Sequence, residues 1–287
     1  MTTSSFEYFA PTTLGEAQTL LSQYGGDAKI VAGGHSLIPT MKIRLAEPKY
    51  LIDLGRISEL SYIREQEGGI AIGAMTTYYQ IESSSTVRSR YLALAEASGE
   101  VADMQVRNKG TIGGSLAHAD PAADLPAVIL ALEGQISLAS SGGQRTLVAD
   151  DFLVDTFSTA LGDDEIIAEI RIPALPANTG GSYKKFGNKA SHFAIVGVSA
   201  IVTMSGGTCQ RVRIGITGAG PRAVRGRSAE AVLEGKEPTG SNLAQASEQA
   251  AQGIDFLGDI HASEEYRAHL TRVFTRRALE EAISRAR

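Results

Sequence analysis

Two glycine pairs, each placed between apolar segments, constrain this 287-residue sequence more than any other feature. The first pair lies in Ala32-Gly33-Gly34-His35-Ser36, directly after the apolar run Lys29-Ile30-Val31, and the second lies in Thr111-Ile112-Gly113-Gly114-Ser115. Glycine has no Cβ, so it tolerates positive φ and lets backbone N–H groups approach a ligand closely. Successive N–H groups in such a turn form a concave anion site. Two such turns would suit the two phosphates of one dinucleotide.

The spacing of the glycines leaves a second interpretation open. Neither pair matches G-x-G-x-x-G, and G-x-x-x-x-G-K-[ST] does not occur in the sequence. Glycine pairs are also common formers of ordinary tight turns. The residues alone therefore predict either a phosphate-binding pair of turns or two turns without a ligand.

Composition and charge exclude several classes of function. The net charge of −5, without a basic run, argues against nucleic-acid binding. No apolar stretch approaches the 18 residues of a membrane-spanning helix. The N-terminus Met1–Glu7 lacks the basic and apolar regions of a signal peptide, so we expect a cytoplasmic protein.

The cysteine and histidine content argues against a metal or cluster in this chain. Cys209 is the only cysteine, whereas an iron–sulfur cluster needs several thiolates. The five histidines form no closely spaced ligand pair, so no zinc or other metal site is predicted.

Hydrophobic periodicity predicts an ordered series of elements. A strand over residues 28–31, a helix over 37–45 and a strand over 50–54 form a βαβ unit around the first glycine pair. Thr13 and Glu16 form a capping box for an earlier helix, and Thr77 and Gln80 form another. Further helices are predicted over 88–98 and 125–132, the latter with Asp124 as its N-cap. Hairpins are predicted over 61–72, around Glu65–Gly69, and over 135–148.

The stretch Pro173–Gly181, with its prolines and glycines, is the clearest domain boundary. Beyond it, strands over 182–186, 193–204 and 209–217 precede several helices, of which the last begins near Ser263. Antiparallel strands followed by helices indicate an α+β domain. We therefore place one domain at 1–176 and a second at 177–287.

The segment Ala32–Pro39 resembles the FAD-binding medium subunit of the molybdenum hydroxylases, in particular its carbon monoxide dehydrogenase type. The stretch Thr111–Gly114, followed by Asp120-Pro121 and Asp124–Ala127, agrees with that family's spacing. So does Asp164–Ile167 ahead of Ile172-Pro173, and the resemblance covers essentially the whole chain.

The resemblance implies an α+β fold in which a vanillyl-alcohol-oxidase-like (PCMH-type) FAD-binding domain precedes a C-terminal α+β domain with an antiparallel sheet and helices. The FAD-binding domain would have two subdomains, roughly 1–57 and 58–176. The C-terminal domain would span 177–287.

The implied function is electron transfer. A large subunit would hold the molybdenum cofactor and oxidise carbon monoxide, a heterocycle or an aldehyde. A small subunit would hold two [2Fe-2S] clusters, and non-covalent FAD in this chain would pass electrons to a quinone, a cytochrome, NAD or oxygen. The family implies a dimer of heterotrimers (a heterohexamer), cytoplasmic or attached through the complex to the inner face of the membrane. The alternatives are a stand-alone flavin oxidoreductase and a non-catalytic α/β module without cofactor.

By the same resemblance, the N–H groups of residues 33–37 would bind the FAD pyrophosphate, with Ser36 as a side-chain donor and Ala32 and His35 in the same loop. The histidine has a second interpretation, as a loop residue without a chemical role. The other wall of the phosphate and ribityl site would comprise Gly110, Thr111, Gly113, Gly114 and Ser115. Ser115 stands where most relatives have asparagine, so one contact is expected to be lost.

The resemblance also assigns the flavin end of the site. Asp124 would accept hydrogen bonds from the sugar hydroxyls of the cofactor, besides capping its helix. Val101 and Ala102 would line the flavin, and Ile167 would offer backbone contacts to the ring edge. Lys185 would place a cation near the isoalloxazine, where it would stabilise the anionic reduced flavin and raise its potential, although Lys184 and Lys189 are close in sequence. Phe193 falls where several relatives carry a tyrosine, so only stacking remains there.

Overall fold

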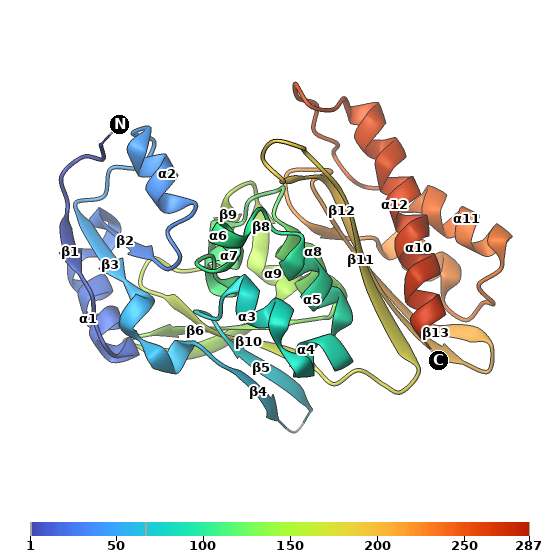
Figure 1. Cartoon of the computed structure of the whole chain (residues 1–287), viewed down its shortest axis with the longest axis horizontal. Helices are drawn as coiled ribbons and strands as arrows, with labels where there is room; N and C mark the ends of the chain where they lie inside the picture. The colour runs from blue at the N-terminus through green and yellow to red at the C-terminus, as the bar shows by residue number, and fades with distance from the viewer. Residues whose placement is uncertain (1, 67, 287) are drawn as a thin grey trace.

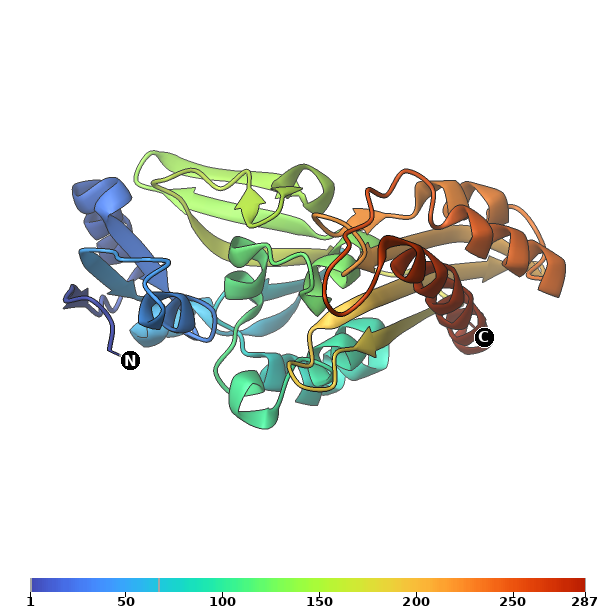
Figure 2. The same cartoon turned by 90° about the horizontal axis from the view of Figure 1, so that it is seen from above.

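The computed structural model describes residues 2–66 and 68–286, and it places three regions in a row, as Figures 1 and 2 show. The first region, in blue, is built on a small three-stranded parallel sheet with strand order β1-β3-β2. Its elements are β1 (Glu7–Phe9), α1 (Leu14–Tyr24), β2 (Ala28–Val31), α2 (Leu37–Lys42) and β3 (Tyr50–Asp53), with short 3-10 helices at Gly25–Asp27, Leu54–Arg56 and Ser58–Leu60.

The predicted βαβ unit is confirmed, since β2 and β3 pair in parallel around α2. Thr13 caps α1 by accepting from the Glu16 N–H. The carboxylate of Glu16 binds the backbone N–H of Thr12 (2.8 Å) instead of that of Thr13, so this capping box is only half formed. The capping box of Thr77 and Gln80 is complete.

The second region contains a five-stranded antiparallel sheet of order β4-β5-β10-β6-β7, with helices on one side. Both predicted hairpins are present, although Glu67 in the first turn lies outside the described residues. The elements are β4 (Ile63–Gln66), β5 (Gly69–Gly73), α3 (Tyr78–Ser83), α4 (Ser85–Arg90), α5 (Leu92–Gly99), α6 (Met104–Arg107), α7 (Ile112–His118), α8 (Asp124–Ala131), β6 (Gln135–Ser140), β7 (Gly143–Val148), α9 (Ala149–Phe152), β8 (Leu153–Asp155), β9 (Ser158–Thr159) and β10 (Ile166–Pro173).

The structure corrects two sequence expectations in this region. The single helix predicted over 88–98 is two helices, because the chain leaves helical geometry at Tyr91 (φ −133°). The Tyr91 side chain is buried and its hydroxyl donates to the Pro173 carbonyl (3.2 Å), so tertiary packing overrides the local pattern. The second glycine pair is not a turn, since Gly113 and Gly114 lie in the first turn of α7.

The third region is a four-stranded antiparallel sheet of order β11-β12-β13-β14, followed by three helices. Figure 1 shows α12 along the outer face of this sheet, while α5 and α8 of the second region contact the other face. The elements are β11 (Thr179–Gly187), β12 (Ala194–Ser205), β13 (Thr208–Thr217), β14 (Val224–Arg225), α10 (Arg227–Leu233), α11 (Gly240–Gln249) and α12 (Glu264–Arg285).

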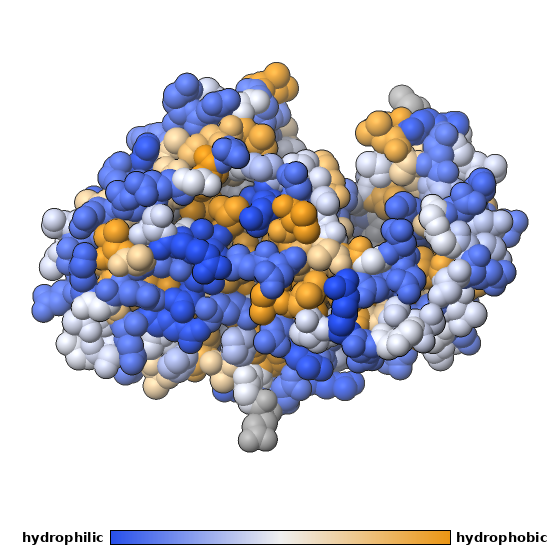
Figure 3. Space-filling model, turned by 180° about the vertical axis from the view of Figure 1, so that it is seen from behind, coloured by the Kyte–Doolittle hydropathy of each residue, from blue (hydrophilic) through white to orange (hydrophobic). Residues whose placement is uncertain are grey.

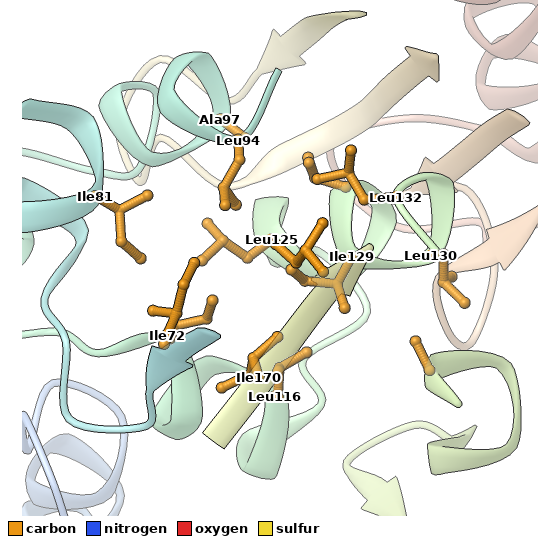
Figure 4. Close-up of a cluster of buried hydrophobic side chains, with 14 of the residues drawn as sticks. Ile72, Ile81, Leu94, Ala97, Leu116, Leu125, Ile129, Leu130, Leu132 and Ile170 are labelled. Atoms are coloured by element: carbon orange, nitrogen blue, oxygen red, sulfur yellow. The ribbon is translucent and has the colours of Figure 1, made fainter. Parts of the chain in front are cut away.

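Helix α8 lies at the centre of the largest hydrophobic core. All eight of its residues are buried. Figure 4 shows Leu125 and Ile129 of α8 between Leu94 of α5 and Ile170 of β10. Tyr183 and other residues of the third region also belong to this core, so α8 joins the two larger sheets. The first residue of α8, Asp124, is thereby held at the junction of these sheets.

A buried arginine of α12 fixes the end of the third sheet. The guanidinium of Arg267 donates to the carbonyls of Ile195 (2.6 Å) and Gly218 (2.7 Å) and to Asp259 (2.7 Å). Arg267 is 5% exposed. Because buried carbonyls and charges are costly when unpaired, this one side chain stabilises the contact between α12 and the ends of β12 and β13.

We expect Arg267→Met to lower the free energy of unfolding by about 3 kcal/mol, since it leaves two buried carbonyls without donors. Arg276→Met on the same helix removes an exposed pair with Glu280, so it should change stability by less than about 0.5 kcal/mol. Urea unfolding of both full-length variants measures the difference. Equal stabilities would contradict the structural role of Arg267.

Candidate functional site

The first glycine loop connects β2 to α2 and needs both of its glycines. Gly34 has φ +74°, a conformation that side chains with a Cβ rarely adopt. A Cβ on Gly33 would lie 2.1 Å from the Lys109 carbonyl oxygen, so Gly33 lets the loop approach the backbone ahead of α7. The loop is therefore held against the second region through glycine-specific contacts.

The N–H groups of Gly33 to Leu37 are consecutive and, within residues 2–66 and 68–286, donate to no protein acceptor. The Ser36 hydroxyl is likewise without a bond to the helix that it precedes. Both His35 and Ser36 are exposed. Five unpaired donors at the start of a helix can receive an anion, because N–H groups of this kind require an acceptor.

The second glycine motif differs, because its N–H groups already have protein partners. Gly113 donates to the Ala74 carbonyl (2.9 Å), and Ile112 donates to the Thr76 carbonyl (3.1 Å). Gly114 donates to the Thr111 hydroxyl (3.1 Å), which caps α7. The expectation that both motifs offer free N–H groups to an anion is therefore wrong. Among the described residues of the two motifs, only the first loop has consecutive N–H groups without an acceptor.

The two motifs nevertheless face each other. A Cβ placed on Gly114 would lie 3.7 Å from the Cβ of Ala32. Gly110, also of the second motif, packs beneath the Tyr78 ring, where a Cβ would come within 2.5 Å. Figure 3 shows a notch in the surface between the first region and the rest of the molecule. The motifs predicted from the sequence thus lie at one boundary between regions.

A buried carboxylate lies at the start of α8. Asp124 accepts a hydrogen bond from the Tyr183 hydroxyl (2.5 Å) and pairs with the Lys185 ammonium (2.9 Å). The side chains of Asp124 and Lys185 are 5% and 4% exposed. Lys185 also donates to the Glu100 carbonyl (2.9 Å). Two charges so deeply buried are stable only because they neutralise and hydrogen-bond each other.

Burial raises the pKa of Asp124 to about 6, while Lys185 and Tyr183 counteract part of that rise. Burial also raises the pKa of Tyr183 well above its ordinary value, and the charge of Asp124 adds to this effect. Tyr183 is thus a hydrogen-bond donor at every physiological pH. The helix dipole of α8 further favours a negative charge at this position.

Two expectations about this cluster change. Asp124 is the first residue of α8, and its N-cap is Ala123, without a side-chain cap. Its carboxylate therefore serves Tyr183 and Lys185 and does not cap the helix. Lys185 is one half of a buried ion pair, so the pair presents no net charge while Asp124 is ionised.

The remaining predicted residues lie in the second and third regions. Val101 and Ala102 follow α5, and both of their carbonyls accept from Arg107. Ile167 is buried beside the bulge of β10. The neighbouring Ala168 carbonyl accepts from Ala74, whose own carbonyl binds the start of α7.

Phe193 is 49% exposed and lies in the loop before β12. The next residue, Ala194, donates to the Ala122 carbonyl (3.2 Å), two residues ahead of Asp124. Phe193 is therefore tied to the segment that positions the carboxylate. Ser115, in the first turn of α7, is partly exposed.

Sequence reasoning missed Tyr183. A signal was available, because residues two apart on a strand face the same side and Tyr183 precedes Lys185 by two. A tyrosine on the same face as a predicted site lysine could therefore have been included. Its bond to Asp124, which is 59 residues away, has no signature in the local pattern.

We expect Gly33→Ala to destabilise the chain by about 1–3 kcal/mol, because the new Cβ would overlap the Lys109 carbonyl. Gly15 in α1 has no atom within 4 Å of an added Cβ, and Gly15→Ala should leave stability equal or higher, by up to about 1 kcal/mol. Thermal and urea unfolding compare the two. A harmless Gly33→Ala would contradict the close approach of the first loop to Lys109.

We expect the stability difference between Asp124→Asn and the parent chain to depend on pH. The folded-state pKa of Asp124, about 6, lies above the ordinary aspartate value of 3.8. The raised pKa stabilises the fold below pH 4, and this contribution is lost as pH rises through 6. The free energy of unfolding of Asp124→Asn should therefore rise relative to that of the parent between pH 4 and 7, by on the order of 3 kcal/mol. Urea unfolding at four pH values measures this. A pH-independent difference would show that Asp124 titrates normally.

Comparison with known proteins places the chain in a family. Residues 4–175 match the model of the FAD binding domain in molybdopterin dehydrogenase, and residues 181–282 match that of the CO dehydrogenase flavoprotein C-terminal domain. The chain is 41% identical to the carbon monoxide dehydrogenase medium chain of Hydrogenophaga pseudoflava, over 98% of both chains. It is 38% identical to the 6-hydroxypseudooxynicotine dehydrogenase complex subunit alpha of Paenarthrobacter nicotinovorans, over 99% of this chain and 96% of that one.

A solved structure agrees over the same length. The structure of the Hydrogenophaga pseudoflava carbon monoxide dehydrogenase that lacks the Mo-pyranopterin moiety contains a chain with a TM-score of 0.97 and 42% identity, and 99% of each chain is covered. These likenesses confirm the α+β fold and the resemblance of Ala32–Pro39 and Thr111–Ala127. The chain belongs to the family of FAD-binding flavoprotein subunits of the molybdopterin dehydrogenases.

Proposed function

We propose that this chain is the FAD-carrying electron-transfer subunit of a molybdenum hydroxylase complex. Its FAD receives electrons from the [2Fe-2S] clusters of a small subunit and passes them to an external acceptor, while a large subunit oxidises the substrate at the molybdenum cofactor. The observation that carries this proposal is the run of five N–H groups, Gly33 to Leu37, that bind no acceptor in the part of the chain that the structure describes and lie opposite the second glycine motif. The family membership supports the same cofactor.

The residues of the first loop fit a pyrophosphate. Consecutive N–H groups without protein acceptors supply donors, and the exposed Ser36 hydroxyl supplies one more. Backbone donors are suited to phosphates because they present partial positive charge without a mobile side chain. Ala32 and His35 complete the loop.

The second motif supplies shape instead of donors. The N–H groups of Gly113 and Gly114 are engaged, so Gly110, Thr111, Gly113, Gly114 and Ser115 would contact the cofactor through close backbone approach and the Ser115 hydroxyl. The missing Cβ of Gly114 keeps open the space toward Ala32. This division explains why both motifs need glycine although only one offers free donors.

Asp124 retains the capacity to bind a sugar hydroxyl. An ionised carboxylate offers about four acceptor positions, and the structure uses positions for Tyr183 and Lys185. Val101, Ala102, Ile167 and Phe193 would surround the flavin end. FAD supplies the redox chemistry, and the protein supplies its position and electrostatic surroundings. Lys185 would act on the flavin together with Asp124, as a pair.

The chain would work with partners. Its homologues and structural neighbours are subunits of larger dehydrogenases, and its single cysteine cannot hold a cluster. We propose large and small partner subunits in a dimer of heterotrimers, in the cytoplasm or at the inner face of the membrane. Among residues 2–66 and 68–286, no helix has the length and apolar character needed to cross a membrane. A quinone, a cytochrome, NAD and oxygen are the candidate acceptors.

We also propose the domain division at 1–57, 58–176 and 177–287. Each segment contains one of the three larger sheets. The two family models meet between residues 175 and 181. Limited proteolysis that cuts near residue 177 would support the second boundary.

Cofactor release tests the proposed function. The full chain is purified alone and with any co-purifying subunits, then denatured, and the freed cofactor is identified by chromatography and mass. We expect one non-covalent FAD per chain. The absence of flavin from both preparations, even after incubation with FAD, would overturn the proposal in favour of a module without cofactor.

Gly114→Val is expected to reduce FAD occupancy to below a tenth of that of the parent, because its side chain would extend toward Thr111 and Ala32 into the space between the motifs. Gly15→Val, at an exposed helix position with open space around it, is the control and should bind FAD normally. Circular dichroism verifies that both variants fold. Full FAD occupancy in the folded Gly114→Val chain would contradict the placement of the cofactor between the two motifs.

A further inference from the structure

The Asp124 carboxylate is held by side chains from another sheet. Asp124 begins α8, whereas Tyr183 and Lys185 both belong to β11. The Tyr183 hydroxyl donates to one carboxylate oxygen at 2.5 Å, and Lys185 pairs with the same group at 2.9 Å. The third region therefore determines how a side chain of the second region is oriented.

The Tyr183 hydroxyl can reach Asp124 because the neighbouring strand has a glycine where the tyrosine side chain passes. A Cβ on Gly197 of β12 would lie 2.3 Å from the Tyr183 hydroxyl and 3.0 Å from its ring. Glycine inside a strand weakens the strand and marks a close approach of another group. Gly197 therefore weakens its strand locally and leaves the space that the Tyr183 hydroxyl occupies.

The backbone of Tyr183 is fixed independently. Its N–H donates to the Glu96 carboxylate of α5 (2.9 Å), and Glu96 pairs with Arg285 of α12 (2.7 Å). Tyr183 is 4% exposed. Its hydroxyl therefore has little freedom to leave the carboxylate.

The ionisable groups around Asp124 come from three other parts of the fold. Tyr183 and Lys185 approach from β11, Glu100 follows α5, and Tyr78 approaches from α3. Glu100 opposes the ionisation of Asp124, whereas Tyr183 and Lys185 favour it. The Tyr183 hydroxyl is the neutral donor that the carboxylate uses, and it favours ionisation without adding charge.

We propose that Tyr183 is a positioning residue of the FAD site: its hydroxyl holds the Asp124 carboxylate in one orientation and in the ionised form, so that the remaining acceptor positions of the carboxylate face the cofactor. This inference depends on the proposed function for its ligand. The geometry of Tyr183, Gly197 and Asp124 itself does not depend on it.

Removal of the hydroxyl should change the protonation of Asp124. A hydrogen bond to an ionised carboxylate lowers its pKa, so Tyr183→Phe would raise the pKa of Asp124 beyond its present value. We expect the shift to be about one pH unit or more, the usual effect of losing a hydrogen bond to a charged group. Near neutral pH, a larger fraction of Asp124 would then be protonated and unable to accept as strongly from a hydroxyl.

The test is the affinity of the full chain for FAD from pH 5 to 9. In Tyr183→Phe, the pH below which affinity falls should move upward by about one unit. At pH 9, where Asp124 is ionised in both chains, the affinity of Tyr183→Phe should be lower by only about threefold, because the carboxylate then keeps its charge and loses only its fixed orientation. Tyr91→Phe is the matched control. It removes a hydroxyl from the same core, bonded to the Pro173 carbonyl, and should leave the pH profile unchanged.

A second variant isolates the carboxylate. Asp124→Asn should flatten the same part of the pH profile, and Tyr183→Phe should then add no further pH shift. A shift of the same size in the Asp124→Asn background would overturn the proposal, because Tyr183 would be acting through another group.

A measurement without FAD separates this inference from the proposed function. Urea unfolding from pH 4 to 8 reports the Asp124 pKa in the free chain, and the decline of stability with rising pH should extend about one unit higher in Tyr183→Phe. If the parent binds no FAD, the proposed function fails, and the unfolding profile still tests the Tyr183–Asp124 bond. Superimposable unfolding profiles for Tyr183→Phe and the parent would overturn the inference.

Discussion

The buried contact among Asp124, Tyr183 and Lys185 joins the two larger sheets, and the proposed FAD site depends on it. A carboxylate and an ammonium withdrawn from water are stable only when each is paired and hydrogen-bonded. Here the partners come from α8 and β11, so the ion pair requires the two larger sheets to be correctly packed. The same packing buries every residue of α8. The site and the core are thus stabilised by one arrangement, and a change in either one affects the other.

The two glycine motifs contribute in different physical ways. The first loop leaves the N–H groups of Gly33 to Leu37 available, whereas the N–H groups of Gly113 and Gly114 bind Ala74 and Thr111. In the proposed site, donors on one side and a close backbone wall on the other would position a pyrophosphate without a basic side chain. This agrees with a chain of net charge −5 and without a basic run, in a family of FAD-binding subunits.

Much of the fold was predictable because it depends on local sequence. The βαβ unit around α2, the two hairpins, the capping box at Thr77 and the start of the last helix near Ser263 follow from periodicity and residue type, and the structure confirms them. The errors occur where distant contacts override local preference. Tyr91 interrupts a predicted helix because its side chain packs in the core and its hydroxyl reaches Pro173, and the second glycine pair is helical because Thr111 caps it.

The sequence by itself determined the class of the fold, the two glycine motifs and the family, because each of these depends on the types of residues that lie close together at regular spacing. Only the tertiary structure decided which motif keeps free donors, and that Asp124 binds Tyr183 and Lys185 instead of capping α8. The partners of Asp124 lie 59 and 61 residues along the chain. Contacts at such separation depend on how sheets and helices pack, and local periodicity carries no information about that packing.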